Sequence, residues 1–469
     1  MAGIGFRLQK LLSGDDYTSS LKAYAFSTLI TAGPFLITVV LVLFIQRLSL
    51  SNLTAHAMAY LQALITHAYA FSLITVGVSY LVVPRYVADE YYRGHVTSFT
   101  ASFFSAYALN LLVWGPWVFW FFSGLDAGWA VRLNAMLLYA LAVGIWLAMI
   151  YLSAAHGYWE VSRSFLAGMF VSMAGAWFLG RAKGLPGYFS GFVAGQAVVL
   201  FLLVWTMIKE FGYWEARDHN WLRYFRLHPR LAAIGLFYNL GIWADKFVFW
   251  YSHEGERLDS RLRYSLIYDS PMFFAYLTIL PSLVYFFLQV ETDFFFKYHD
   301  YYLAIQKQEG LAVLELRRRE IVASLRHSLK RLLTVQGICS CMALVLVPWI
   351  VELARMNPLQ MSVLRIGIYA AFLQAGALIF LNVLFYFDHQ PEALAVAFVF
   401  CLLNALCTAA TLRLGLPAYG YGYAAACMGS LALGVYYINE RLRLLHFWTF
   451  MRQPLPRPVV VADEREVEI

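Results

Sequence analysis

The chain has 469 residues, of which 61% are hydrophobic and only 13% are charged, and its formal net charge is +7. Soluble domains carry roughly 25% charged residues, so this composition, with a mean hydropathy of +0.62, excludes an ordinary soluble protein and gives no support to nucleic-acid binding. Long apolar runs recur throughout and predict an all-α polytopic membrane protein, since β-barrel strands would alternate apolar and polar positions instead.

A short amphipathic segment, residues 1–22, precedes the first apolar span. Within MAGIGFRLQKLL, the residues Ile4, Leu8, Leu11 and Leu12 fall on one face of a helix, and the basic residues point elsewhere. The segment is too short and too charged to cross a bilayer. We expect it to lie along the cytoplasmic membrane surface or against a partner.

The apolar runs predict about twelve transmembrane helices, arranged as two six-helix bundles. The first bundle is expected at 23–208, a cytoplasmic linker at 209–230, the second bundle at 231–438 and a cytoplasmic tail at 439–469. The expected spans are 23–46, 56–83, 99–122, 132–155, 164–180, 188–208, 231–251, 268–290, 333–352, 361–387, 392–412 and 420–438.

The orientation follows from the basic residues, which gather in the linker and in residues 297–332. Positive charge marks cytoplasmic loops, so both stretches and both termini are expected in the cytoplasm. The tail is Pro-rich and then acidic, and part of it is expected to be disordered. The five cysteines lie in or beside apolar spans and are expected to be ordinary core residues, since Cys339 and Cys341 lack a neighbouring histidine or acid.

The longest extramembrane stretch is 291–332, and its second half has the spacing of an amphipathic helix. The apolar positions of that helix are Leu311, Leu314, Val322, Leu325 and Leu329. One interpretation is a helix that lies on the membrane surface. The other is a docking site for a cytosolic partner.

One internal repeat is visible, because GLPGYFSGFVA at 184–194 resembles GLPAYGYGYAA at 415–425. Each copy precedes the last expected span of a bundle. The repeat indicates a parallel duplication of a six-span unit, although tight turns at helix starts also favour Gly followed by Pro.

Polar groups at membrane depth are the strongest functional signals, because hydrocarbon penalises each by about 2.5–3.5 kcal/mol. Span seven carries Asn239, Asp245 and Lys246, which we expect to line a polar pathway facing water between the two bundles. The alternative is a structural ion pair that joins helices. Span ten completes the predicted transport cavity with three further residues: Arg365 near one end, and Gln374 and Asn382 deeper in the span.

Prolines are expected to kink or break two spans, Pro34 in span one and Pro271 and Pro281 in span eight, which also carries Asp269. Kinked helices suit a protein that rocks between inward-open and outward-open shapes.

The predicted cytoplasmic mouth is aromatic and charged. Its charged residues are Arg85 and Asp89 after span two, and Glu291 and Asp293 after span eight. The rings beside them fit either an interfacial aromatic belt or a surface on which sugar faces stack.

Enzymatic chemistry has little support, because no paired carboxylates, metal-ligand spacing or phosphate-binding loop appears. His67, His156 and His389 are scattered along the chain. We therefore expect a protein that is not an enzyme and holds no cofactor or metal.

Four stretches resemble the PelG family, the inner-membrane component of the Pel exopolysaccharide system: MAGIGFRLQKLL, YAFSTLITAGPFLI, NLGIWADKFVFW and VETDFFFKYHDYY. The chain length, the expected spans and the short loops agree along nearly the whole chain. An acidic residue often follows the Phe of the opening motif in that family. Here Arg7 stands there, so no role for such a charge carries over.

The resemblance implies a fold similar to the multidrug/oligosaccharidyl-lipid/polysaccharide exporters (MATE/MOP flippase-like), with two bundles around a central cavity. It implies export of a galactosamine-rich polymer across the bacterial inner membrane. The implied partners are a cytosolic glycosyltransferase and inner-membrane proteins of the Pel complex, including a cyclic-di-GMP receptor, in a lipid bilayer.

Two other functions stay open on the sequence. The chain could work alone as a flippase for lipid-linked oligosaccharides or as an ion-coupled multidrug exporter, with Asp245 as the coupling site. It could instead be a scaffold that assembles and activates the glycosyltransferase.

Overall fold

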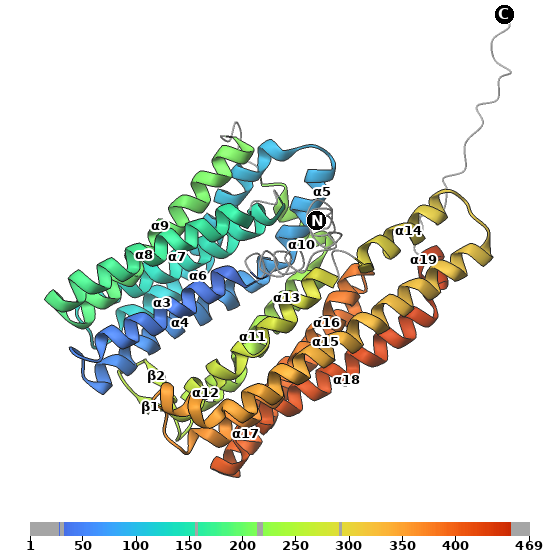
Figure 1. Cartoon of the computed structure of the whole chain (residues 1–469). Coiled ribbons are helices and arrows are strands. Elements are labelled where there is room, and N and C mark those ends of the chain that lie inside the picture. Colours follow the sequence, from blue (N-terminus) through green and yellow to red (C-terminus); the bar gives the residue numbers. More distant parts are fainter. Residues whose placement is uncertain (1–27, 29–31, 155–157, 213–218, 290–292, 452–469) are drawn as a thin grey trace, which may run out of the picture.

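The structure of the chain, a computed structural model, describes residues 28, 32–154, 158–212, 219–289 and 293–451. One bundle comprises α3 (Gly33–Ser49), α4 (Ala55–Tyr80), α6 (Phe99–Ser123), α7 (Trp129–Ala154), α8 (Tyr158–Lys183) and α9 (Leu185–Phe211). The other comprises α11 (Pro229–Trp250), α12 (Leu266–Leu277), α13 (Leu280–Gln289), α15 (Leu311–Leu353), α16 (Gln360–Tyr386), α17 (Gln390–Arg413) and α18 (Tyr421–Arg443) (Figure 1).

Short elements lie at the two ends of these bundles. The helices α5 (Val82–Tyr92), α10 (Trp221–Leu227), α14 (Phe295–Gln306) and α19 (Leu445–Met451), with the 3-10 turn η1 (Val96–Ser98), lie at one end, here called the basic end. An antiparallel hairpin of β1 (Glu256–Arg257) and β2 (Arg263–Tyr264) lies at the opposite end, here called the hairpin end, as does the turn η3 (Leu416–Ala418).

Ten helices in the described part of the chain are long and apolar enough to cross a membrane. Two others, the shorter α3 and the less apolar α18, occupy the places of the first and last expected spans. Together they confirm the all-α polytopic fold. The expected amphipathic segment 1–22 and the tail beyond residue 451 lie outside the described residues.

The internal repeat has the same structural role in both bundles. Its first copy leads into α9, which packs against α8, and its second leads into α18, which packs against α17. A Cβ atom on Gly191 would lie 2.3 Å from the Ala176 nitrogen, and one on Gly422 would lie 2.5 Å from the Thr408 nitrogen. Each glycine therefore permits a close crossing between the last two helices of its bundle.

Span eight is broken, as its prolines predicted. The chain forms α12 and then α13, with a turn at Thr278 and Ile279 between them, and Pro281 stands in the first turn of α13. Pro271 lies inside α12. In span one, Pro34 lies in the first turn of α3, where proline is readily accommodated because the nitrogen there needs no helical partner.

The structure does not support the interpretation that the amphipathic segment 311–332 lies on the membrane surface. It joins the following span without interruption, so α15 is a single helix of 43 residues. Its charged first half extends from the basic end of the second bundle (Figure 1). A helix with one continuous backbone hydrogen-bond ladder and no break cannot turn to lie flat on a bilayer that its second half crosses.

The two bundles meet through α4 and α11. Near the basic end these helices approach at Gly77 and Gly235, where a Cβ atom on Gly235 would lie 2.1 Å from the Gly77 carbonyl oxygen. Farther along the same pair, the His67 and Trp250 rings stack with their centroids 4.2 Å apart. Both contacts join residues on one helix from each bundle, so the seam is narrow.

Candidate functional site

A buried polar cluster lies near the C-terminal end of α11, about five residues before Trp250. Asp245 is completely buried, and its carboxylate accepts a hydrogen bond from the Tyr268 hydroxyl at 2.7 Å and a weaker one from Asn404 Nδ2 at 3.3 Å. Asn404 also donates to the Gly241 carbonyl oxygen, and Thr408 donates to Asn404. Three helices of the second bundle, α11, α12 and α17, therefore satisfy one carboxylate.

The neighbouring Lys246 completes this cluster. Its ammonium lies 3.3 Å from the Asp245 carboxylate and donates to the Tyr276 hydroxyl at 3.0 Å. It also lies over the aromatic rings of Trp243, Tyr276 and Tyr423. Charge neutralisation, hydrogen bonds and cation–π contacts together offset the cost of burying two ions.

A second acid, Asp269, connects this region to the seam between the bundles. One of its oxygens accepts hydrogen bonds from Trp250 Nε1 at 2.6 Å and from the Ser265 nitrogen at 3.0 Å. Trp250 is the residue that stacks on His67 of the first bundle. A movement of α4 against α11 would therefore disturb the partners of Asp269 directly.

The expected water-facing position of Asp245 is not what the structure has. Asp245 lies inside the second bundle, away from the seam, and every contact described above is made within that bundle. The reason is physical: α12 and α17 supply enough hydroxyl and amide donors to satisfy the carboxylate without water. In this conformation Asp245 and Lys246 pair within α11, and their hydrogen bonds to residues of α12 and α17 connect that helix to its neighbours.

The other residues of the predicted cavity are not brought to this cluster. Asn239 lies at the close approach of Gly77 and Gly235 and bonds the Gly235 carbonyl oxygen. Asn382 bonds its own helix at Leu378. Gln374 and Arg365 lie on α16. Gln374 is buried beside a cavity of ≈ 10 Å³ that Tyr238 of α11 also lines, whereas Arg365 is exposed.

The predicted mouth residues divide between the bundles. Arg85 and Asp89 form an ion pair of 3.6 Å within α5. Asp293 pairs with Lys297 at 2.9 Å and accepts a hydrogen bond from Ser324 of α15. Burial opposes ionisation of Asp293, but Lys297 and Ser324 outweigh it and lower the pKa of that carboxyl. Glu291 lies outside the described residues.

The predicted docking face of α15 is largely covered by the chain itself. Leu314 and Leu325 are buried, Val322 and Leu329 are partly buried, and Leu311 is 71% exposed. Phe294, Ile379 and Tyr386 share a small cavity with this face. Docking of a partner there stays a prediction, with Leu311 as its accessible residue.

A set of hydrogen bonds joins the bundles at the hairpin end, and we call it the hairpin latch: Tyr60, Asp126, Asp259, Ser260 and Arg261. Asp259 Oδ2 accepts from the Tyr60 hydroxyl at 2.5 Å, and the Asp126 nitrogen donates to both Asp259 oxygens at 2.7 and 2.9 Å. Ser260 donates to the Gly124 carbonyl oxygen at 2.7 Å, and Arg261 lies 4.1 Å over the Trp120 ring.

The electrostatics of the latch favour a charged Asp259. Burial raises the pKa of its carboxyl, but hydrogen bonds from Tyr60, Asp126 and Ser260 have the larger combined effect and hold the pKa below its usual range. Asp259 is therefore ionised near neutral pH, and each bond to it is charge-assisted.

Sequence reasoning missed the latch and most of the cluster. Tyr60 and Asp259 are 199 positions apart, and no local pattern links them. Asn404 and Tyr268 left a weaker signal, because both lie within expected spans where each polar group needs a partner.

The described residues hold no group of three or more His, Cys, Asp or Glu side chains arranged to bind a metal. What the geometry offers is two packed bundles, a narrow seam, a hydrogen-bonded latch at one end and a satisfied polar cluster in one half. This arrangement can change shape by rotation of one bundle against the other.

Solved transporter structures share this architecture. The chain is similar to a MOP superfamily transporter from Pyrococcus furiosus, described as having a binding pocket of reverse polarity, at 13% identity and a TM-score of 0.60, covering 93% of this chain and 98% of that one. A MATE in the straight conformation gives the same values. An inward-facing multidrug resistance MATE transporter gives 10% identity and a TM-score of 0.59, covering 87% and 95%.

These similarities define the fold as that of a MATE/MOP superfamily transporter. No curated protein matches the chain. The family model for PelG, described as "Putative exopolysaccharide Exporter (EPS-E)", matches residues 1–450. The chain belongs to the PelG family.

Proposed function

We propose that this protein exports a galactosamine-rich exopolysaccharide across the bacterial inner membrane by alternating access between its two bundles. The observation that carries the proposal is the join between the bundles. Among the described residues, its main helix pair is α4 with α11, and a polar latch adds to it at the hairpin end. Such a join can open by rotation of one bundle against the other.

The family and the fold support the class of cargo and the mode of movement. The PelG family model is that of a "Putative exopolysaccharide Exporter", and the similar MATE structures include an outward-facing and an inward-facing conformation. The basic end carries Arg85, Arg223, Arg226 and the arginines of the first half of α15. By the positive-inside rule this end faces the cytoplasm and the hairpin end faces outward.

The proposal includes an assembly. A cytosolic glycosyltransferase would supply the polymer at the basic end, together with inner-membrane proteins of the Pel complex, including a cyclic-di-GMP receptor. The long first half of α15 offers a rigid support for such a contact, with the exposed Leu311 at its start.

The buried cluster favours a second candidate, an ion-coupled flippase that acts alone. Asp245 and Lys246 form a desolvated pair whose partners span three helices, which is a suitable place to couple protonation to movement. The scaffold function would need neither the pair nor the latch.

The experiment that tests these functions is deletion of the gene followed by complementation. Secreted polymer should disappear in the deletion strain and return with the wild-type gene. The variant Asp245→Asn should lower secretion while the glycosyltransferase still co-purifies with the chain. Unchanged secretion in the deletion strain would contradict the proposal, and unchanged secretion by Asp245→Asn with an intact complex would favour the scaffold.

A further inference from the structure

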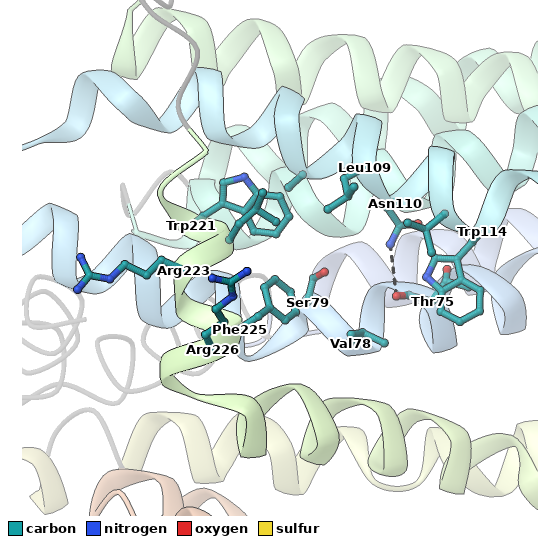
Figure 2. Close-up of a pocket in the computed structure, with 13 residues that line it drawn as sticks. Thr75, Val78, Ser79, Leu109, Asn110, Trp114, Trp221, Arg223, Phe225 and Arg226 are labelled. Atoms are coloured by element: carbon teal, nitrogen blue, oxygen red, sulfur yellow. Dashed lines mark hydrogen bonds between the residues drawn. The ribbon is translucent and has the colours of Figure 1, made fainter.

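The first bundle contains a pocket of ≈ 660 Å³ that lies apart from the polar cluster and the latch. Its walls come from α4 and α6, and α10 closes its basic end (Figure 2). Between Ala106 and Trp114 the α6 wall is about 12 Å long, at 1.5 Å per residue. The pocket is therefore large enough and long enough for part of an aliphatic chain.

The deep walls of the pocket are mostly apolar. Val78, Leu109, Val113 and Trp114 supply most of this surface. Of the polar groups that line the pocket, Asn110 already donates to the Thr75 carbonyl oxygen at 3.3 Å, and Ser79 adds one hydroxyl. The apolar walls therefore suit an aliphatic chain better than a sugar, which would need many hydrogen-bonding groups.

The pocket borders the surface that faces lipid. On α6, Leu109 is 36% exposed, Val113 is 57% exposed and their neighbour Leu112 is 73% exposed. Large apolar side chains on a membrane-spanning helix stay exposed where hydrocarbon surrounds them. A chain from the bilayer can therefore enter from the side.

The basic end of the pocket carries two arginines from α10. Arg223 and Arg226 are both exposed and line the pocket, and neither forms a salt bridge with another described residue. In Figure 2, Arg226 lies beside Phe225 at the mouth, and Arg223 extends outward from the same end. Positive charge at one end and apolar walls at the other match the two parts of an anionic lipid.

The position of α10 is fixed on the first bundle. Trp221 Nε1 donates to Ser105 of α6 at 3.1 Å, and the Tyr224 ring packs edge-on against Tyr86 of α5. The helix then leads through His228 directly into α11. A ligand held between α10 and α6 would therefore stabilise the connection between the two bundles.

We propose that this pocket is a binding site for an anionic phospholipid, with its phosphate on Arg223 and Arg226 and one acyl chain between α4 and α6. A bilayer phospholipid fits better than a polyprenyl phosphate, because the α6 wall of about 12 Å lies within the roughly 15 Å of one leaflet. A polyprenyl chain is longer than that leaflet.

The test uses the full chain purified in a neutral detergent and native mass spectrometry with phosphatidylglycerol, phosphatidylcholine or undecaprenyl phosphate added. The wild type should prefer phosphatidylglycerol. The double variant Arg223→Gln/Arg226→Gln should lose roughly tenfold or more of that affinity. The variant Arg326→Gln/Lys330→Gln is the matched control, since it removes two exposed charges from the basic end of α15 and should bind within about twofold of the wild type.

A second variant separates lost binding from lost folding. Leu109→Trp fills the pocket from a partly exposed position and keeps both arginines, so it should also lose phosphatidylglycerol while its melting temperature in lipid-free detergent stays unchanged. Equal binding of phosphatidylglycerol and phosphatidylcholine would overturn the proposal. So would equal losses in the α10 and α15 double variants, or a preference for undecaprenyl phosphate.

Discussion

The hairpin latch gives a sharp prediction for the variant Asp259→Asn. The wild-type carboxylate accepts from the Tyr60 hydroxyl and, through both oxygens, from the Asp126 nitrogen. The asparagine amide keeps one acceptor oxygen, but its nitrogen is a donor and would face the Tyr60 hydroxyl or the Asp126 nitrogen, which are donors themselves. Hydrogen bonds to a charged group contribute about 1.5–3 kcal/mol and neutral ones about 0.5–1.5 kcal/mol. The conformation with a closed hairpin end should be destabilised by about 2–3 kcal/mol in total. This corresponds to a shift of roughly 30- to 150-fold in the equilibrium toward the open conformation.

Distance measurements between spin labels would detect this shift. The labels belong at Ser51 and Leu414, which are exposed at the hairpin end on different bundles, in a chain whose native cysteines have been replaced. Asp259→Asn should add a longer component to the distance distribution. The matched control is Glu256→Gln on the same hairpin, where the side chain is exposed. If both variants gave the wild-type distribution, the latch would not hold the bundles together.

Three further predictions concern the latch, the seam and the cluster. The pKa of Asp259 is lowered in the folded protein. The stability that the latch gains from the Asp259 carboxylate is therefore complete above the ordinary Asp pKa of about 3.9, and it is lost as the pH falls through the lowered pKa. The label distances should stay constant from about pH 8 to 5 and lengthen only below about pH 4. Gly235→Val should destabilise this conformation, since even a Cβ would lie 2.1 Å from the Gly77 carbonyl oxygen, and the melting temperature would report it; a wild-type melting temperature would contradict this close approach. Lys246→Met should lower the free energy of unfolding by about 3–5 kcal/mol, because it leaves the Asp245 carboxylate without its cation. The double variant Asp245→Asn/Lys246→Met should recover part of that stability. If the losses of the two single variants simply added in the double variant, the two residues would not be a coupled pair.

The sequence predicts the fold well because hydrocarbon imposes a simple rule on backbone polar groups. The backbone N–H and C=O groups of each span must bond to one another within the span, so the length of an apolar run is enough to predict where a helix lies. The prolines likewise predict the break between α12 and α13. The continuity of α15 escaped the same reasoning because charge, not backbone geometry, ended the apolar run near residue 332.

The site was predicted less completely because it depends on which faces of distant helices meet. The sequence singled out Asp245 and Lys246 by the cost of burying them. It could not show that Tyr268 and Asn404 would satisfy Asp245 inside one bundle. The latch joins residues from both halves of the chain, and only the packing of α4 against α11 brings them together.

The most direct test of alternating access is a reversible crosslink at the hairpin end. Cysteines at positions 126 and 259, where the Asp126 nitrogen now lies 2.7 Å from the Asp259 carboxylate, would join the bundles in a chain without its native cysteines. Polymer secreted by cells carrying this variant is measured after oxidation and again after reduction. The account predicts that oxidation stops export, that reduction restores it to the level of the same variant before oxidation, and that oxidation leaves export by either single-cysteine variant unchanged. Export at an undiminished rate by the crosslinked protein would contradict it.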